Sequence, residues 1–480
     1  MRRWLHKTDF LRSWFGVSSY SIVENKTVFA GKIWRIMKRK HMYLLEQEIL
    51  KLKQKNFRGE NIVLFHINHF LDNSLAFNQA AAQIFEKVVF LGVPYHSEAT
   101  GVKKYQCWDY PCYYGRWKAE KFLMYRNGRQ MDTFTGDYDD VCKSMLETIL
   151  REELLHAVQR GKQILVLEDG GYLCQFFEEW KQKYPQLEGS IIGSVEQTTS
   201  GMRRSMRYYG RNGYEFPCIS VSRSDFKMDV EALFIGSRIV EELERGLYDL
   251  DTFMEFHQVL LLGYGVLGRV IADILQKRRL QLTVYDIDPG IRQLAREEGY
   301  SVVDSIQQFA FHKDTVVLGV TGEESFTIEM LEMFRHSPAK RMYLASGSSK
   351  QIEFRSFLHH VGYSGPKGGQ RKSRYTFSAG ENEIAKQVYL LAEGMPLNFY
   401  KKNGGSLTFS VMDFIFTEML LCGCSLLRRK DLEKRMYLAG RDEVTELDEA
   451  LLFHKWCKLY GLLEQYPGTH PAKEYLRGLH

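Results

Sequence analysis

The sequence lacks several features that mark special classes of protein. No apolar run approaches the roughly 18 residues that a membrane-spanning helix needs, and the first residues contain no apolar core of a signal peptide. The eight cysteines are scattered, and Cys422 and Cys424 have no second pair that would complete a zinc site. We therefore expect buried free thiols, no metal site and a cytoplasmic protein, because a reducing compartment favours free thiols.

The chain also lacks a strong charge of either sign. Its formal net charge of +6 is small for 480 residues, so the charge gives no reason to expect a nucleic-acid partner. Residues 1–58 are locally basic, and Arg35, Lys38, Arg39 and Lys40 precede apolar positions at helical spacing. We interpret this extension as a docking helix with a solvated positive face, and contact with an acidic partner or a membrane surface is the alternative.

From residue 61 onwards, short apolar runs alternate with stretches of helical periodicity. This alternation predicts an α/β fold, in which helices cover a parallel sheet and ligands bind at the carboxyl ends of the strands. The Gly-, Lys- and Arg-rich stretch 362–378 is predicted to be a surface loop. We expect strands at 62–65, 88–91, 164–167, 217–221, 259–262, 282–285, 315–320, 342–345 and 388–392, and helices at 70–85, before Gly161, at 229–247 and at 410–422.

The most specific stretch is a glycine-rich turn between two of these strands. Gly263, Gly265 and Gly268 follow an apolar run in the order G-x-G-x-x-G, and Asp286 ends the next apolar run. In a dinucleotide-binding βαβ unit the first glycine permits the tight turn, the second lets the backbone approach a pyrophosphate, and the third lets the helix pack closely. A purely structural glycine turn is the alternative. We predict NAD as the cofactor, because the Asp286 carboxylate would accept a hydrogen bond from the ribose 2′-OH and would repel a 2′-phosphate.

Two other strand ends carry residues suited to acid–base chemistry. His66 and His69 follow the strand at 62–65, and Glu168-Asp169-Gly170-Gly171 follows the strand at 164–167. Acids followed by paired glycines favour a loop at which side chain and backbone both meet a ligand. A turn that caps a helix is an equally good interpretation of this loop.

Seven stretches resemble, in the same order, the motifs of S-adenosylhomocysteine hydrolase. They lie at 69–74, 168–172, 196–201, 263–270, 286–289, 345–348 and 390–398. The resemblance implies an α/β fold of two domains, with a Rossmann-type NAD-binding domain inserted in an α/β substrate domain, and a homo-oligomer. We accordingly divide the chain into the basic extension (1–58), the first part of the substrate domain (59–235), the NAD-binding domain (236–400) and a C-terminal segment that returns to the substrate domain (401–480).

The resemblance implies a concealed redox cycle, in which bound NAD oxidises a ribose 3′-hydroxyl, homocysteine is eliminated, water adds and the ketone is reduced again. His69 matches the acid/base histidine of this family, and Asp169 matches its partner carboxylate. Gln197 stands where the family has a ribose-binding glutamate, which leaves Glu196 as the neighbouring catalytic candidate. The implied cofactor-binding residues are the motif positions Gly263, Gly265, Val266, Leu267, Gly268 and Asp286, together with Thr198, Thr199, Ser200, Thr321 and Asn398.

The family's catalytic lysine, followed by an acid four residues later, matches Lys227 and Glu231 when the residues are counted from the strand at 217–221. Counting back from the segment 236–238 gives a register that differs by one residue. Lys227 is therefore a candidate catalytic residue, and an ordinary surface lysine is the alternative.

Other positions depart from the pattern. Ser348 and Gly405 replace two histidines, one of which gates substrate entry, and Lys473 and Tyr475 have the wrong spacing for the family's C-terminal Lys-x-x-x-Tyr. Neither replacement can transfer a proton near pH 7 as an imidazole does, and the loss of one such group costs roughly 10²–10⁴ in rate. We therefore expect poor hydrolysis of S-adenosylhomocysteine itself.

Three functional hypotheses follow. The first is an enzyme that uses NAD to oxidise a hydroxyl of a nucleoside-like or other small molecule. The second is a non-catalytic NAD-binding sensor, whose basic extension contacts a partner. The third is a true hydrolase with relocated histidines, for which His66, His96 and His359 are available. A plain 2-hydroxy-acid dehydrogenase would share the glycine unit but not the segments at 168–171 and 196–201.

Overall fold

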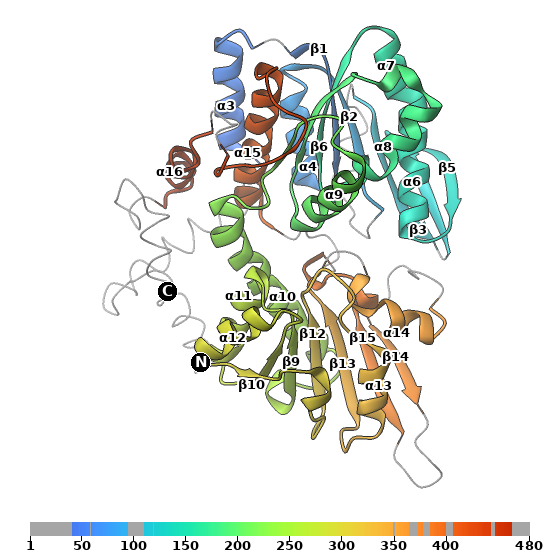
Figure 1. Cartoon of the computed structure of the whole chain (residues 1–480), viewed down its shortest axis with the longest axis vertical. Coiled ribbons are helices and arrows are strands. Elements are labelled where there is room, and N and C mark those ends of the chain that lie inside the picture. The colour runs from blue at the N-terminus through green and yellow to red at the C-terminus, as the bar shows by residue number, and fades with distance from the viewer. Residues whose placement is uncertain are drawn as a thin grey trace.

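The computed structural model describes residues 41–57, 59–94, 110–118, 120–348, 351–363, 372–377, 385–399, 407–442 and 447–462. These residues form two α/β domains, each built on its own sheet, and helix α10 leads from the first domain to the second (Figure 1). The predictions for the basic cluster at 35–40, for His96, for Gly405, and for Lys473 and Tyr475 concern residues outside the described part of the chain.

The first domain contains a nine-stranded sheet in the order β16-β8-β7-β6-β1-β2-β3-β4-β5. Its central strands are parallel and are buried on both faces, which explains why they are apolar at nearly every position. Strands β3, β4 and β5 form an antiparallel meander at one edge. The strands are β1 (Gly59–Asn68), β2 (Phe85–Gly92), β3 (Cys112–Lys118), β4 (Lys121–Arg126), β5 (Arg129–Thr135), β6 (Gln163–Glu168), β7 (Ile191–Glu196), β8 (Cys218–Ser220) and β16 (Met436–Leu438).

Helices cover both faces of this sheet, and β1 shows how. Ile62 and Leu64 pack with α3, α4, α15 and α16 on one face, whereas Val63 and Phe65 pack with α6, η1, α7 and α8 on the other. The helices are α3 (Tyr43–Gln54), α4 (Asp72–Ala81), α6 (Tyr138–Ile149), η1 (Leu150–Leu154), α7 (Leu155–Gln159), α8 (Tyr172–Lys183), η2 (Pro185–Leu187), α9 (Thr199–Asn212), α15 (Phe409–Arg428) and α16 (Glu449–Tyr460).

The second domain contains a seven-stranded sheet in the order β11-β10-β9-β12-β13-β15-β14. Counted from β9, the parallel strands have the order 3-2-1-4-5-6, which is that of the Rossmann fold and confirms the predicted fold class. Ligands bind in such sheets where the order reverses, which here is at the carboxyl ends of β9 and β12. The strands are β9 (Gln258–Leu262), β10 (Gln281–Tyr285), β11 (Ser301–Val302), β12 (Thr315–Gly319), β13 (Arg341–Ser346), β14 (Lys372–Phe377) and β15 (Lys386–Leu391).

The helices of this domain flank its sheet on both sides (Figure 1). A single π-helical turn, η3 (Phe226–Glu231), leads into the connecting helix α10 (Ala232–Tyr248). The remaining helices are η4 (Met254–Phe256), α11 (Val266–Lys277), α12 (Pro289–Glu297), η5 (Ile306–Gln308), α13 (Ile328–Arg335), η6 (Ile352–Phe354), α14 (Arg355–His360), η7 (Ala392–Gly394) and η8 (Leu397–Phe399).

The chain returns to the first domain after the second is complete. Strand β16 pairs with β8 in the first sheet, and α15 packs against β6, β7 and α3. The Rossmann-type domain is therefore inserted within the first domain. Helix α3, which the sequence-based division assigned to the N-terminal extension, contributes Leu44, Leu45 and Ile49 to the core of the first domain.

Several sequence-based expectations need correction. Residues 372–377, predicted as part of a surface loop, form the antiparallel edge strand β14. His66, predicted in a loop, lies within β1. Helix α15 is long and apolar enough to cross a membrane by length and composition, contrary to the expectation that no segment is, but 83% of its apolar window is buried within the protein. The seven described cysteines are free and buried, as expected.

One buried carboxylate connects three helices of the first domain. Asp413 of α15 accepts hydrogen bonds from the backbone N–H groups of Leu44 and Leu45 at 2.8 and 2.9 Å, at the start of α3. It also accepts from the Tyr460 hydroxyl of α16 at 2.7 Å. Without this carboxylate, three donors would remain without a partner in the core, which is costly.

We predict that Asp413→Ala lowers the free energy of unfolding of the first domain by about 2–4 kcal/mol. Urea unfolding followed by circular dichroism measures the effect. The control is Asp431→Ala, which removes a carboxylate that pairs with Arg429 at the surface and should change the stability little, because exposed ion pairs contribute little. Equal effects of the two substitutions would show that Asp413 does not connect the helices as described.

Candidate functional site

The loops at the carboxyl ends of the two sheets meet. His69, which follows β1, stacks on Phe399 at the end of η8, with ring centroids 4.1 Å apart and an interplanar angle of 20°. Arg207 of α9 forms an ion pair with Glu323, which follows β12, at 3.2 Å. The predicted acid–base residues and the predicted nucleotide site therefore lie on facing edges of the two domains.

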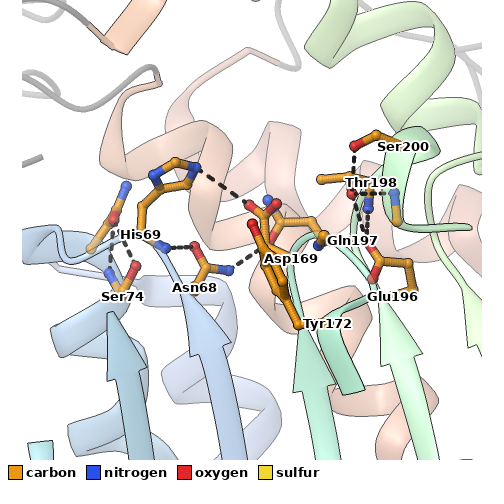
Figure 2. Close-up of polar contacts among 12 residues, drawn as sticks. Asn68, His69, Ser74, Asp169, Tyr172, Glu196, Gln197, Thr198 and Ser200 are labelled. Atoms are coloured by element: carbon orange, nitrogen blue, oxygen red, sulfur yellow. Dashed lines mark hydrogen bonds and ion pairs between the residues drawn. The ribbon is translucent and has the colours of Figure 1, made fainter. Parts of the chain in front are cut away.

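His69 is held by a chain of hydrogen bonds across the first sheet (Figure 2). The Gln197 side-chain oxygen accepts from the Asn68 amide at 2.8 Å, and the Asn68 side-chain oxygen accepts from the His69 backbone N–H at 2.8 Å. The His69 side chain is buried, and burial lowers the pKa of its imidazole to about 3. His69 is therefore neutral near pH 7.

Asp169 is placed by the end of β6 beside this imidazole (Figure 2). The distance from His69 Nε2 to Asp169 Oδ2 is 3.9 Å, which is too long for a hydrogen bond but places the carboxyl next to the imidazole. Burial raises the pKa of the Asp169 carboxyl to about 6, and the nearby positive charge of Lys227 opposes this increase. His69, Asp169 and Lys227, predicted from three separate segments, are therefore brought together.

Lys227 lies on η3 and is not a surface lysine. It is 9% exposed, and its ammonium group forms an ion pair with Glu231 four residues later. A π-helical turn contains one residue more than an α-helical turn. Side chains on this turn therefore do not follow the α-helical spacing that sequence periodicity assumes.

The loop after β6 is fixed by a buried pair of carboxyl groups. Glu196 accepts from the N–H groups of Gly170 at 3.1 Å, Gly171 at 2.7 Å and Thr198 at 2.6 Å. Glu168, which is its register partner in the sheet, accepts from the Leu173 N–H at 3.0 Å. Burial raises the pKa of both carboxyls, and the negative charge of Glu168 raises the pKa of Glu196 further because like charges repel.

The backbone of this loop explains why two consecutive positions are glycine. Gly170 and Gly171 have φ angles of +121° and +62°, which other residues rarely adopt. Gly171 also begins α8, so the loop is both a helix start and the support of Asp169. Glu196 was predicted to be catalytic, but the structure places its carboxylate on backbone donors, where it holds the loop.

The predicted hydroxyl run lies at the N-terminus of α9. Thr198 caps the helix, since its Oγ1 accepts from the Gly201 N–H at 3.1 Å and donates to Glu196 at 2.6 Å. The Ser200 hydroxyl donates to Thr198 Oγ1 at 3.4 Å, and Thr199 is the first residue of the helix. These residues begin α9, the helix whose Arg207 pairs with Glu323 of the second domain.

The glycine turn after β9 has the geometry that a dinucleotide needs. Gly263 has φ +99°, and a Cβ at Gly268 would come within 2.2 Å of the Gly263 carbonyl oxygen. At Gly265, which caps α11, a Cβ would meet nothing within 4 Å, so the space outside the turn is open. Val266 and Leu267 begin α11, and the N–H groups of a first helical turn have no acceptor within the helix.

Asp286 lies against this turn at the end of β10. Its Oδ2 accepts from the Tyr264 N–H at 2.7 Å, and its Oδ1 accepts from the Asp288 N–H at 2.9 Å. The carboxylate thus joins the glycine turn to the loop after β10, where the ribose of a dinucleotide lies in this fold.

A second buried carboxylate, Glu353, organises the loops after β12 and β13. Its Oε1 accepts from the N–H groups of Thr321 at 2.6 Å and Gly322 at 2.9 Å, and both of its oxygens accept from the Thr321 hydroxyl. The hydroxyls of Ser325 and Ser348 also donate to it. Ser348, which stands where the resembling family has a histidine, is therefore part of this loop structure.

Asn398 is buried on η8, next to the Phe399 ring that stacks on His69. The chain reaches it through Ala392, Glu393 and Gly394, which have φ angles of 51°, 55° and 79°. Two consecutive non-glycine residues in this region cost energy and are found mainly at functional sites. The η8 segment that carries Asn398 thus reaches His69 of the other domain through the Phe399 ring.

Sequence reasoning missed Glu353, Phe399 and Glu418. Glu353 and Phe399 gave no local signal, because their partners are distant in the sequence. Glu418 did give a signal, since a carboxylate within an apolar helix of 20 residues is unusual unless it is functional or paired. The predicted alternative histidine His66 is a core residue, hydrogen-bonded to Asn78 at 2.7 Å and packed against Phe77.

Comparisons with known proteins give distant similarities. No protein-family model matches the chain. The chain is similar to the pyruvate reductase of Chlamydomonas reinhardtii, with 9% identity over 77% of this chain and 98% of that one and a TM-score of 0.37. It is also similar to a phosphoglycerate oxidoreductase from Vibrio cholerae, with 10% identity over 74% and 97% of the two chains and a TM-score of 0.34. The relation to S-adenosylhomocysteine hydrolase is not shown by these comparisons and remains a resemblance of motifs.

The pKa of Asp169 leads to a prediction about stability. Because the folded pKa is raised from 3.8 to about 6, the charged carboxylate destabilises the fold above pH 6, and this cost disappears as the pH falls towards 4. Asp169→Asn should therefore increase the free energy of unfolding by about 2–3 kcal/mol at pH 7.5, and by much less at pH 4. Urea unfolding at the two pH values measures the difference, with the exposed Glu60→Gln as the control. A gain that does not depend on pH would contradict the raised pKa.

Proposed function

We propose that this protein is an NAD-dependent redox enzyme that oxidises a hydroxyl group of a small, nucleoside-like molecule. The observation that carries the proposal is the convergence of His69, Asp169 and Lys227 on the edge that faces the glycine turn. Burial moves both His69 and Asp169 towards their neutral forms. Residues with shifted pKa values that lie at the carboxyl ends of parallel strands favour a reactive site.

The described residues fit NAD. Gly263, Gly265 and Gly268 supply the turn and the open space for a pyrophosphate, and Asp286 supplies a carboxylate at the position of the ribose. Thr321 and Asn398 lie on the loops that border the same edge. When bound, NAD would supply the hydride acceptor for the oxidation of an alcohol.

The acid–base residues have separate tasks in this proposal. Neutral His69 accepts the hydroxyl proton, and the adjacent Asp169 carboxylate stabilises the imidazolium that forms. Lys227 supplies a positive charge beside Asp169, which keeps part of the carboxyl population ionised near neutral pH. The hydrogen bonds from Gln197 through Asn68 hold the backbone of His69. The imidazole is therefore in position before a substrate binds.

We infer that hydrolysis of S-adenosylhomocysteine is not the main activity. The serine that replaces a family histidine, Ser348, donates its hydroxyl to Glu353 and is thereby part of the loop structure. A non-catalytic NAD sensor is the second candidate, because the Phe399 ring covers one face of the His69 imidazole. The two candidates differ in whether any alcohol is turned over.

We predict that Gly268→Ala weakens NAD binding roughly tenfold or more, which is at least about 1.4 kcal/mol. The added methyl group would collide with the Gly263 carbonyl and displace the turn that receives the pyrophosphate. Isothermal titration calorimetry with NAD measures the loss, and circular dichroism confirms that the variant is folded. Gly210→Ala on α9 is the matched control, since its methyl group would meet nothing within 4 Å. Unchanged NAD affinity of Gly268→Ala would rule out this turn as the cofactor site.

A second prediction concerns turnover. With a panel of nucleosides and other alcohols, the wild-type protein should produce the absorbance of reduced nicotinamide, and His69→Gln should lower that rate roughly 10²–10⁴-fold while NAD binding stays intact. The exposed His312→Gln is the control, with an expected rate equal to wild type. If NAD binds and no alcohol is oxidised by the wild-type protein, the sensor hypothesis is favoured instead.

A further inference from the structure

A second group of carboxyl side chains lies around Lys227, and it comes from the C-terminal helices α15 and α16. Glu418 of α15 is within electrostatic range of Lys227, of Glu231 and of Glu449, which begins α16. These helices follow the inserted domain in the sequence, yet they pack behind the turn that carries Lys227. None of the roles proposed above for the site uses Glu418 or Glu449.

Glu418 is completely buried, and few groups near it would stabilise a negative charge on its carboxyl. Its Oε2 accepts a hydrogen bond from the Ser224 hydroxyl at 3.2 Å, and its Oε1 has no hydrogen-bond partner among the described residues. A charged carboxylate with one unpartnered oxygen is very unfavourable in a protein core. A protonated carboxyl group avoids most of this cost.

Taken together, burial and the groups around Glu418 raise its pKa. Burial raises the pKa of Glu418 well above its ordinary value, and the neighbouring carboxyls Glu449 and Glu231 raise it further. The hydrogen bond from Ser224 and the charge of Lys227 lower it, and these influences are smaller than those of burial and Glu449 but larger than that of Glu231. The other titratable neighbour on its own helix is the buried thiol of Cys422, whose pKa is also raised by burial.

The same two helices hold the backbone of the turn that carries Lys227. The Ser224 hydroxyl, which donates to Glu418, accepts from the Lys227 N–H at 3.4 Å, and Glu449 accepts from the Phe226 N–H at 2.7 Å. The Phe226 ring stacks on Phe414 of α15 with centroids 3.7 Å apart. The position of Lys227 therefore depends on contacts from α15 and α16.

We infer that Glu418 keeps its proton at neutral pH and is a positioning residue for Lys227, which it holds through Ser224 without placing another negative charge beside the ammonium group. A further buried carboxylate would bind the proton of Lys227 more tightly, and a group that takes part in proton transfer must be able to release it. Glu231 and Asp169 then remain the anionic neighbours of Lys227. The relevance of this arrangement to turnover rests on the proposed function, but the arrangement itself can be tested without a substrate.

The test compares Glu418→Gln, which is neutral and has the same shape, with Glu418→Leu, which cannot accept from Ser224. The full-length protein is labelled with ¹⁵N-lysine, and the titration of the Lys227 amine is followed by NMR, with Lys227→Arg identifying its signal. We expect Glu418→Gln to leave the titration midpoint unchanged. We expect Glu418→Leu to lower it, because a Lys227 that is no longer held loses part of its pairing with Glu231.

Two outcomes would overturn the inference. If Glu418→Gln lowers the midpoint by about one pH unit or more, Glu418 carries a negative charge in the native protein. If Glu418→Leu titrates like the wild type, Glu418 does not position Lys227. Ser224→Ala, which removes only the connecting hydroxyl, replaces Glu418→Leu if that variant does not fold, and it should lower the midpoint in the same way.

An infrared measurement tests the proton directly. The carbonyl band of a protonated carboxylic acid should be present in the wild-type protein at pH 7 and should lose intensity in Glu418→Gln, and equal intensity in both would contradict the inference. Neither measurement uses NAD or a substrate. Failure of the NAD-binding or turnover experiments would therefore count against the proposed function, and not against the role of Glu418.

Discussion

The structure depends on buried carboxylates that bind the backbone of loops at the ends of parallel strands. The backbone N–H groups of such loops find no acceptor in the neighbouring strands. A buried donor without a hydrogen-bond partner is costly. In the first sheet Glu196 accepts from Gly170, Gly171 and Thr198. In the second sheet Glu353 accepts from Thr321 and Gly322. One acceptor with several donors makes each loop rigid, so that the groups it presents to the facing domain are placed before any ligand arrives.

Burial also explains why the acid–base residues are unusual. The same loss of hydration disfavours the charged form of an imidazole and of a carboxyl, so the pKa of His69 falls to about 3 while that of Asp169 rises to about 6. The two groups therefore present a neutral base next to a carboxyl that titrates near physiological pH. An exposed pair with the same residues would have neither property. The charged form of Asp169 therefore costs stability that a neutral residue at this position would not.

Parts of the fold and of the site could be predicted because their signals are local. The glycine turn, its helix and the strand before Asp286 lie within about 30 residues, and periodicity placed β1 and β6 well enough to put His69 and Asp169 after strand ends. Lys227 could not be placed from the sequence, because two ways of counting to it disagreed by one residue and only the folded chain shows that it is buried and paired with Glu231. The partners of Glu353 and Glu418 lie on other segments, so only the folded chain shows them. Strand β14 was missed because a charged edge strand resembles a loop in composition.

The insertion of one domain within another gives the C-terminal segment a specific task. Residues that follow the second domain return to the first, where α15 and α16 provide Glu418, Phe414 and Glu449 to the turn that carries Lys227. The same α15 places Asp413 at the start of α3. A movement of α15 relative to the first sheet would therefore disturb Lys227 and the start of α3 together. Because α15 begins only about ten residues beyond Phe399, which contacts His69, the segment of the second domain that reaches His69 and the helix behind Lys227 are also close along the chain.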